Sequence, residues 1–165
     1  MATYPRVYTH SHSPDTYELF GVELKVLLSS KDTYGQFCIV EGTMPPGADG
    51  GLHIHVNEDE SMHLFEGELE VTIGQHVFTL HAGESYFAPR NVQQRLRNIG
   101  KVPARALVVG TPGGFDQFVM AAGTPLIPGV PRDTTPPTPE RMQQILVLAQ
   151  QHGIRLLPDA PKATS

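Results

Sequence analysis

The chain has one cysteine, Cys38, so no disulfide bond can form within it. That scarcity is typical of proteins from a reducing compartment, and we expect a cytoplasmic location. Cys38 itself falls in a predicted strand, where we expect it to fill space as a small apolar residue. No hydrophobic run approaches the length of a membrane span, and residues 1–14 lack the apolar core of a signal peptide. We therefore expect no membrane partner.

Positive charge is also scarce. The 12 lysines and arginines are outnumbered by 17 aspartates and glutamates, and they form no cluster. A mildly acidic chain gains nothing from counterion release, so we expect no nucleic-acid partner. Hydrophobic residues make up 39% of the chain and charged residues 18%, as in ordinary folded proteins. The 165 residues fit a single domain over residues 1–165.

Apolar and polar residues alternate through the first two thirds of the chain, with the period of β-strands. Scattered glycines and prolines break this pattern into short segments. Short strands joined by regular turns predict an all-β sandwich or barrel. The strands we predict cover residues 22–28, 36–44, 51–55, 61–65, 68–73, 77–80, 85–88, 94–97 and 104–109.

The last third of the chain changes character. Residues 114–122 are typical of a short helix, and a proline-rich connector follows over residues 125–139. A second helix is predicted over residues 139–151, with Thr138 as its N-cap and proline at its first position. Gly153 is expected to end this helix.

The pattern with chemical content is a histidine pair. His53 and His55 are two residues apart on a predicted strand, so both imidazoles face the same side. Glu60 begins the next predicted strand, and a hairpin would bring its carboxylate beside them. Two histidines and one carboxylate are typical of non-haem iron sites, and zinc, nickel and manganese also accept such ligands. The alternative is that these three polar residues lie on a solvated hairpin. His10-Ser11-His12 has the same spacing, and we expect it to be a mobile terminal segment.

At this point the sequence resembles the cupin family. The first cupin motif is Gly, five residues, His-x-His, three or four residues, Glu, six residues, Gly. Every position of that motif is matched, by Gly47, His53, His55, Glu60 and Gly67.

The second cupin motif is matched in part. Gly83, Pro89 and Asn98 occupy their places, and Asn91 stands where glycine is usual. Asparagine also tolerates left-handed backbone angles. Gln94 stands where the family's remaining histidine ligand belongs. The resemblance therefore implies a metal site of His53, His55 and Glu60, with Gln94 as a weak fourth ligand or next to an open position.

The resemblance extends beyond the motifs. The early strands, the GGFDQF segment and the proline-rich linker with its final helix are similar to the quercetin-dioxygenase-like single-domain cupins. It implies an all-β cupin fold, a small double-stranded β-helix or jelly-roll barrel with short C-terminal helices. The barrel core is expected over about residues 20–112, with a helical extension over residues 113–165.

A ligand pocket is expected inside this barrel, because a small barrel leaves a mouth for one ligand. Its expected lining is apolar, which suits an aromatic or polyketide-like substrate better than a sugar. Core packing explains the same residues equally well. The candidates are Phe37, Met44, Met62, Phe78, Phe87 and Leu96, with Phe115 and Phe118 closing the mouth.

Other polar residues carry less weight. Alternation points His63 away from the site, although a bulge could reverse it and make it a ligand. His76 and His81 fall at turn edges, where we expect surface residues. Glu58 and Asp59 are expected to shape the turn before Glu60.

We therefore predict a metal-dependent enzyme, a dioxygenase acting on an aromatic or enolisable small molecule. Its cofactor would be one divalent metal, with iron favoured over zinc, nickel and manganese. Glu60 would be a ligand and could also accept a proton. A zinc-dependent cyclase or isomerase of a polyketide-like substrate is an alternative, and a non-catalytic small-molecule-binding cupin is another. Cupins of this length commonly pair, so we also predict a homodimer.

Overall fold

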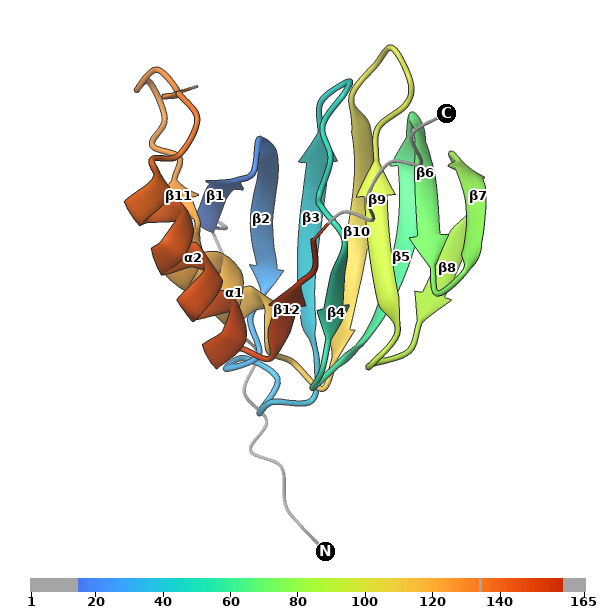
Figure 1. Ribbon diagram of the computed structural model, residues 1–165, viewed down its shortest axis with the longest axis horizontal. Helices are drawn as coiled ribbons and strands as arrows, with labels where there is room; N and C mark the ends of the chain where they lie inside the picture. Colours follow the sequence, from blue (N-terminus) through green and yellow to red (C-terminus); the bar gives the residue numbers. More distant parts are fainter. Residues whose placement is uncertain (1–14, 134, 159–165) are drawn as a thin grey trace, which may run out of the picture.

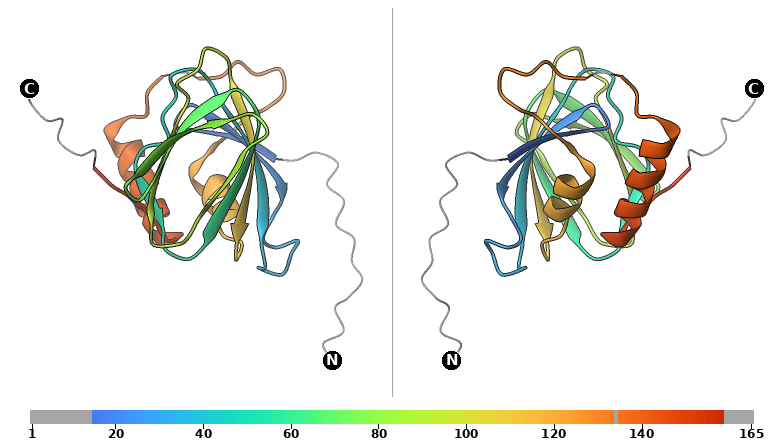
Figure 2. Two further views of the ribbon diagram at one scale, coloured as in Figure 1. Left: turned by 90° about the vertical axis from the view of Figure 1, so that its right-hand side faces the viewer. Right: turned by 90° about the vertical axis from the view of Figure 1, so that its left-hand side faces the viewer.

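The computed structural model describes residues 15–133 and 135–158. Its strands form two sheets that face each other around a common interior, and two helices lie at one side (Figures 1 and 2). The sheets do not share a ladder of paired strands. This is the all-β barrel with short helices that the sequence predicts.

The larger sheet has seven strands in the order β11-β1-β2-β3-β10-β5-β8. Its neighbouring strands are antiparallel throughout. In chain order its members are β1 (Asp15–Leu19), β2 (Val22–Leu28), β3 (Cys38–Met44), β5 (Asp59–Glu66), β8 (Ser85–Ala88), β10 (Ala104–Thr111) and β11 (Thr124–Pro125).

The smaller sheet has five antiparallel strands in the order β12-β4-β9-β6-β7. Its central strand β9 carries Gln94, which pairs with His53 on β4 and with Ile73 on β6. In chain order its members are β4 (His53–His55), β6 (Glu68–Ile73), β7 (His76–His81), β9 (Gln93–Arg97) and β12 (Ile154–Leu156).

Both predicted helices form, as α1 (Phe115–Ala122) and α2 (Pro139–Gln151). The Thr138 side chain accepts a hydrogen bond from the backbone N–H of Arg141, which confirms its role as N-cap. Helix α2 packs against α1 and against β12. The chain returns through β12 to pair with β4, so the C-terminal extension supports the strand that carries both histidines.

The core has two parts. One lies within the barrel and includes Leu64 and Val71, neither of which is exposed. The other lies between the early strands and the helices, where Val40 packs with Val119 of α1 and Ile145 of α2. The helices therefore extend the core of the barrel.

Motif residues of the turns have clear backbone roles. Gly67 has a φ of 82°, and a Cβ atom added there would lie 2.8 Å from Cα of Ala104. Asn91 adopts a φ of 65°, the left-handed conformation expected of a residue in a glycine position. The Asn98 amide donates to the carbonyls of Met44 and Val102 and ties the end of β9 to two neighbouring segments.

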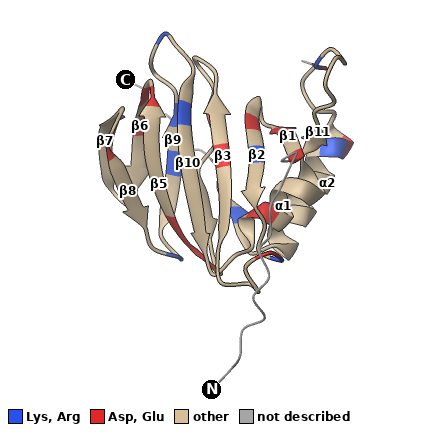
Figure 3. Cartoon of the chain, turned by 180° about the vertical axis from the view of Figure 1, so that it is seen from behind, with Lys and Arg blue, Asp and Glu red and all other residues tan. Residues whose placement is uncertain are grey.

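The positions of charged residues are scattered over the elements in Figure 3. Many are paired across strands, as Arg97 is with Glu70 and Arg105 with Glu66. In the part of the chain that the structure describes, neither helix is long and apolar enough to cross a membrane.

Candidate metal and ligand site

Three strands bring the motif residues together. His53 and His55 lie at the two ends of β4, with ring centroids 5.1 Å apart. Gln94 is the cross-strand partner of His53 on β9, and Glu60 lies near the start of β5 in the opposite sheet. The hairpin expected from the sequence does not form, because β4 and β5 belong to different sheets. The two sheets face each other, and this brings Glu60 beside the histidines, with its Oε2 3.3 Å from Nε2 of His55.

His53 is held through its Nδ1 atom, which lies 3.0 Å from the carbonyl oxygen of Gly51. A carbonyl oxygen only accepts hydrogen bonds, so Nδ1 carries the proton and Nε2 keeps its lone pair. Burial, reinforced by the neighbouring His55, lowers the pKa of His53 and favours this neutral form. His53 thus offers Nε2 as a donor atom at the wall of the cavity described below.

His55 is buried between two carboxylates. Its Nδ1 lies 3.0 Å from Oε1 of Glu58, and its Nε2 faces Glu60. Burial lowers the pKa of His55, but the hydrogen bond to Glu58 and the charges of both carboxylates outweigh burial and raise it overall. The same contact with Glu58 fixes the orientation of the ring and leaves Nε2 toward the site.

Glu60 is fixed by Tyr86. The Tyr86 hydroxyl donates a 2.7 Å hydrogen bond to Oε1 of Glu60, and both side chains are buried. Burial and the negative charge of Glu60 raise the pKa of Tyr86 well above its ordinary value, so the phenol stays protonated and keeps donating. Oε1 of Glu60 is therefore occupied by the hydrogen bond from Tyr86, whereas Oε2 faces His55 and the site.

Glu58 has a larger role than the sequence suggested. It is 4% exposed, and besides contacting His55 it accepts a 3.0 Å hydrogen bond from the backbone N–H of Phe115, the first residue of α1. The interpretation of Glu58 as a turn residue is therefore corrected. Asp59, also expected in the turn, is the first residue of β5, and its carboxylate accepts hydrogen bonds from Arg90. In the sequence, this role of Glu58 is indicated by its position three residues after His55.

Gln94 is 2% exposed, and its Oε1 accepts no hydrogen bond from the residues that the structure describes. A buried amide oxygen without a partner is unfavourable by about 1–3 kcal/mol. Its backbone register with His53 places it on the histidine side of the sheet. The donor set of two imidazoles, a carboxylate and a free amide oxygen fits a divalent metal of the iron or zinc type.

The same donors are not assembled as a finished metal site. Across residues 15–133 and 135–158, no group of three His, Cys, Asp or Glu side chains is arranged to hold a metal ion. His55 and Glu60 contact each other directly instead. Metal binding would therefore replace the His55–Glu60 contact with contacts from both groups to the ion.

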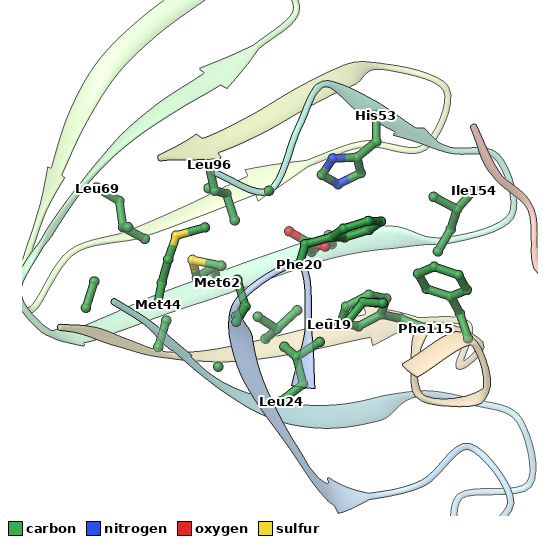
Figure 4. A pocket seen from close by; sticks show the side chains of 18 of the residues that line it. Leu19, Phe20, Leu24, Met44, His53, Met62, Leu69, Leu96, Phe115 and Ile154 are labelled. Atoms are coloured by element: carbon green, nitrogen blue, oxygen red, sulfur yellow. The ribbon is translucent and has the colours of Figure 1, made fainter. Parts of the chain in front are cut away.

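A cavity of about 130 Å³ opens beside these donors (Figure 4). Its walls are almost wholly apolar, and His53 and Glu60 are the polar side chains that line it. An apolar cavity of about 150 Å³ in another protein accepts benzene, so this space fits a single aromatic ring. Five candidates from the sequence line it, namely Met44, Met62, Leu96, Phe115 and Phe118.

Three expected pocket residues do not line this cavity. Phe87 lies between the inward-facing Tyr86 and Ala88, so alternation puts it on the outer face of β8, where it is 59% exposed. Phe78 lies on the edge strand β7 and is 36% exposed. Phe37 precedes β3 in a turn, where its carbonyl oxygen accepts from Thr33. Residue type alone favours an inward direction for each of these aromatic side chains. The direction is decided instead by the position of the residue in its strand and by the place of that strand in the sheet.

The remaining histidines lie away from the site. His63 occupies the outer side of β5, where its Nδ1 contacts the Ser85 hydroxyl at 2.8 Å, so no bulge turns it inward. His76 and His81 are exposed at the ends of β7, as expected. His10 and His12 lie outside the described residues. The cavity wall also contains residues that were not expected from the sequence, among them Leu19, Phe20 and Leu24 of the first hairpin.

Comparisons with known proteins agree with this architecture. A model of the cupin domain matches residues 40–110. The alginate biosynthesis protein AlgA of Pseudomonas putida is 35% identical over 80 residues, which cover 48% of this chain and 16% of that protein. The polyketide synthase CurC of Streptomyces cyaneus is 34% identical over 62 residues, 38% of this chain and 40% of that protein. The match thus spans well under half the length of either relative.

Solved structures show the same fold at low identity. The KdgF protein from Halomonas sp. superimposes with a TM-score of 0.56 at 18% identity, over 62% of this chain and 92% of that one. An RmlC-like cupin from Shewanella frigidimarina gives a TM-score of 0.56 at 18% identity, over 68% of this chain and 96% of that one. The barrel and these structural matches show that the chain has the cupin fold, and the model of the cupin domain matches its central residues 40–110.

Proposed function

We propose that this chain is a metal-dependent cupin enzyme in which His53, His55 and Glu60 hold one divalent metal ion beside an apolar cavity. The supporting observation is that Nδ1 of each imidazole is tied back, to Gly51 in one case and Glu58 in the other. This arrangement orients Nε2 toward a ligand. When bound, the metal would act as a Lewis acid on a substrate oxygen, with iron favoured over zinc, nickel or manganese.

Glu60 has a second role in this proposal. Its Oε1 is occupied by the Tyr86 hydroxyl, whereas its Oε2 faces His55 at the cavity wall. A carboxylate in this position can accept a proton from an enolisable or phenolic substrate. Tyr86 would stabilise the negative form of Glu60 before the transfer and hold the carboxylate in place.

The cavity indicates the substrate class. A sugar carries hydroxyl groups on every side, and each one buried without a partner is unfavourable. The described wall offers polar contacts only from His53 and Glu60, so an aromatic or enolisable small molecule fits better. We propose oxygenation of such a molecule as the reaction. The names of AlgA and of the xanthan biosynthesis protein XanB do not transfer, because the matches cover 16% and 20% of those proteins.

A second candidate is a cyclase or isomerase of a polyketide-like substrate, with zinc in the same site. It is favoured by similarity to CurC and to the tetracenomycin polyketide synthase protein TcmJ of Streptomyces glaucescens, which is 33% identical over 64 residues. The two candidates share the site and the apolar cavity. They differ in whether dioxygen is consumed.

Metal content tests the shared part of the proposal. The protein is purified without added metal or chelator, and its metals are measured by elemental analysis. We expect close to one divalent ion per chain, lost in the variant with His53→Ala and His55→Ala. The matched control carries His76→Ala and His81→Ala, which remove two exposed imidazoles from β7. Equal metal content in the two double variants and the parent would overturn the proposal.

Oxygen consumption separates the two candidates. With the metal-loaded protein, oxygen uptake in the presence of single-ring catechols supports the oxygenase. Product formation from a polyketide-like substrate without oxygen uptake supports the cyclase or isomerase. Ligand binding without any turnover would contradict both and favour a binding protein.

A further inference from the structure

The turn between β1 and β2 holds a large aromatic residue in an unusual backbone conformation. Phe20 has a φ of 54° and Gly21 a φ of 77°, and the pair Leu19–Val22 closes the hairpin around them. Positive φ at both central residues is typical of a type I′ turn, where asparagine and glycine are preferred. A bulky residue such as phenylalanine is rare in the left-handed region.

The side chain of Phe20 lines the ligand cavity. In Figure 4 its ring lies in the middle of the pocket, between His53 on one side and Leu19 on the other. The residue is only partly buried. Central residues of a tight hairpin usually face solvent, so this turn is built to direct an aromatic ring inward, beside the metal-ligand candidates.

Two observations favour a role beyond packing. First, sparsely populated backbone conformations cluster at functional sites, where the surrounding structure compensates for the strain. The Glu18 carboxylate supplies such support here, because it accepts a 2.6 Å hydrogen bond from the backbone N–H of Gly21. Second, the cavity of about 130 Å³ is small beside typical ligand pockets of about 300–1,000 Å³, and the Phe20 ring is one of its walls.

We infer that Phe20 is a specificity-determining residue: its ring limits the ligand to about the size of one aromatic ring and offers that ring a face to pack on. The inference rests on the proposed function, since it concerns the ligand of the same cavity. Offset stacking between two aromatic rings contributes to such selectivity beyond simple burial. Removing the Phe20 ring would enlarge the cavity next to His53 and admit a larger, fused-ring ligand.

The test is a comparison of ligand size in the metal-loaded full chain. Binding of phenol, 1-naphthol and 9-phenanthrol is measured by calorimetry for the parent, Phe20→Ala and Phe20→Asn. Asparagine suits the left-handed turn, so the second variant removes the ring without disturbing the backbone. The control is Phe87→Ala, which removes an exposed phenylalanine from the outer face of β8.

We expect the parent and the control to bind phenol more tightly than 9-phenanthrol. In both Phe20 variants the affinity for 9-phenanthrol should rise about tenfold relative to that for phenol. An unchanged order of affinities in Phe20→Asn would overturn the inference and leave the proposed function standing. Failure of every phenol to bind the metal-loaded parent would instead overturn both, because the cavity would then not be an aromatic site.

Discussion

Nδ1 of His55 lies 3.0 Å from Oε1 of Glu58. The other carboxylate oxygen of Glu58, Oε2, accepts a 3.0 Å hydrogen bond from the backbone N–H of Phe115. One buried side chain therefore joins a candidate metal ligand to the start of α1, the helix that supplies Phe115 and Phe118 to the cavity wall. The ring of Phe115 also packs edge-on against His55, with centroids 5.7 Å apart. The position of His55 and that of the helix are thus coupled.

Glu58→Ala should weaken metal binding without removing a ligand. Carboxylates that orient a metal-bound histidine typically contribute about 10–100-fold in metal affinity. Competition with a chelator measures this loss. The substitution also leaves the N–H of Phe115 without its acceptor, so amide hydrogen exchange at the start of α1 should accelerate.

The control for that prediction is Glu66→Ala, which removes a carboxylate from the exposed end of β5. We expect it to change neither metal retention nor exchange in α1. Parent-like values of both quantities in Glu58→Ala would contradict a link between His55 and the helix.

Gln94→His should tighten metal retention. Gln94 is buried with an unpartnered Oε1 on the histidine side of the sheet, and imidazole is a better ligand than an amide oxygen for iron, zinc or nickel. We expect metal affinity to rise about tenfold, or about 1.4 kcal/mol, and any reaction that needs an open coordination position to slow. Chelator competition measures the first effect.

The neighbouring residue provides a matched control. The Gln93 side chain donates to the carbonyl of Gly74, and it alternates with Gln94 to the other side of β9. Gln93→His should therefore leave metal release unchanged. The same release rate in Gln94→His, Gln93→His and the parent would mean that position 94 does not contact the metal.

Much of the barrel could be predicted because its strands follow a period of two residues. The strands over residues 22–28, 68–73 and 85–88 have the predicted bounds, and so does the helix over residues 139–151. That helix carries local signals, a capping threonine and a proline at its first position, which do not depend on the rest of the fold.

The strands that were missed are held by pairing with other strands more than by their own sequences. β1 has the polar sequence DTYEL and is held by pairing with β2 and β11. β11 has two residues, one of them proline, and β12 has three that pair with β4 from the opposite end of the chain. Such short segments have little intrinsic preference, so tertiary contacts decide their conformation.

The residues of the candidate site also fall into two groups, those that the sequence predicts and those that it does not. The spacing of His53 and His55 fixes a shared face, and the turn before Glu60 is short enough to bring it near, so these residues follow from the motif. The roles of Glu58 and Phe20 do not, because they depend on how a turn directs a side chain across the barrel. Residue type alone suggested a surface turn for Glu58 and gave no signal for Phe20.

The chain should form a homodimer, through the segment before Val22 and the outward faces of the early strands. Residues 1–14 of that segment lie outside the described residues. Ile39 lies between the buried Cys38 and Val40, so its side chain faces outward from β3. Ile39→Arg should therefore halve the mass measured by light scattering at micromolar concentration. The control is Val77→Arg, on the exposed face of β7 in the other sheet, which should leave the dimer intact. A parent protein that is monomeric in the same measurement would refute the prediction.

The ion pair between Asp49 and Arg95 should make stability depend on pH in acid. The hydrogen bond from Arg95 lowers the pKa of Asp49 below its ordinary value of 3.8, although partial burial opposes the shift. A carboxyl whose pKa is lower in the folded state stabilises the fold above its unfolded pKa, and the contribution disappears as the pH falls through the folded pKa. Asp49→Asn should therefore reduce the free energy of unfolding by about 0.5–1 kcal/mol near pH 7, and the difference should shrink below about pH 4.

Urea unfolding of the parent, Asp49→Asn, Arg95→Gln and the double variant at pH 7 and pH 3 isolates the pair from the other contacts of Arg95. A coupling energy that is the same at both pH values would show that the pair does not act through the charge of Asp49.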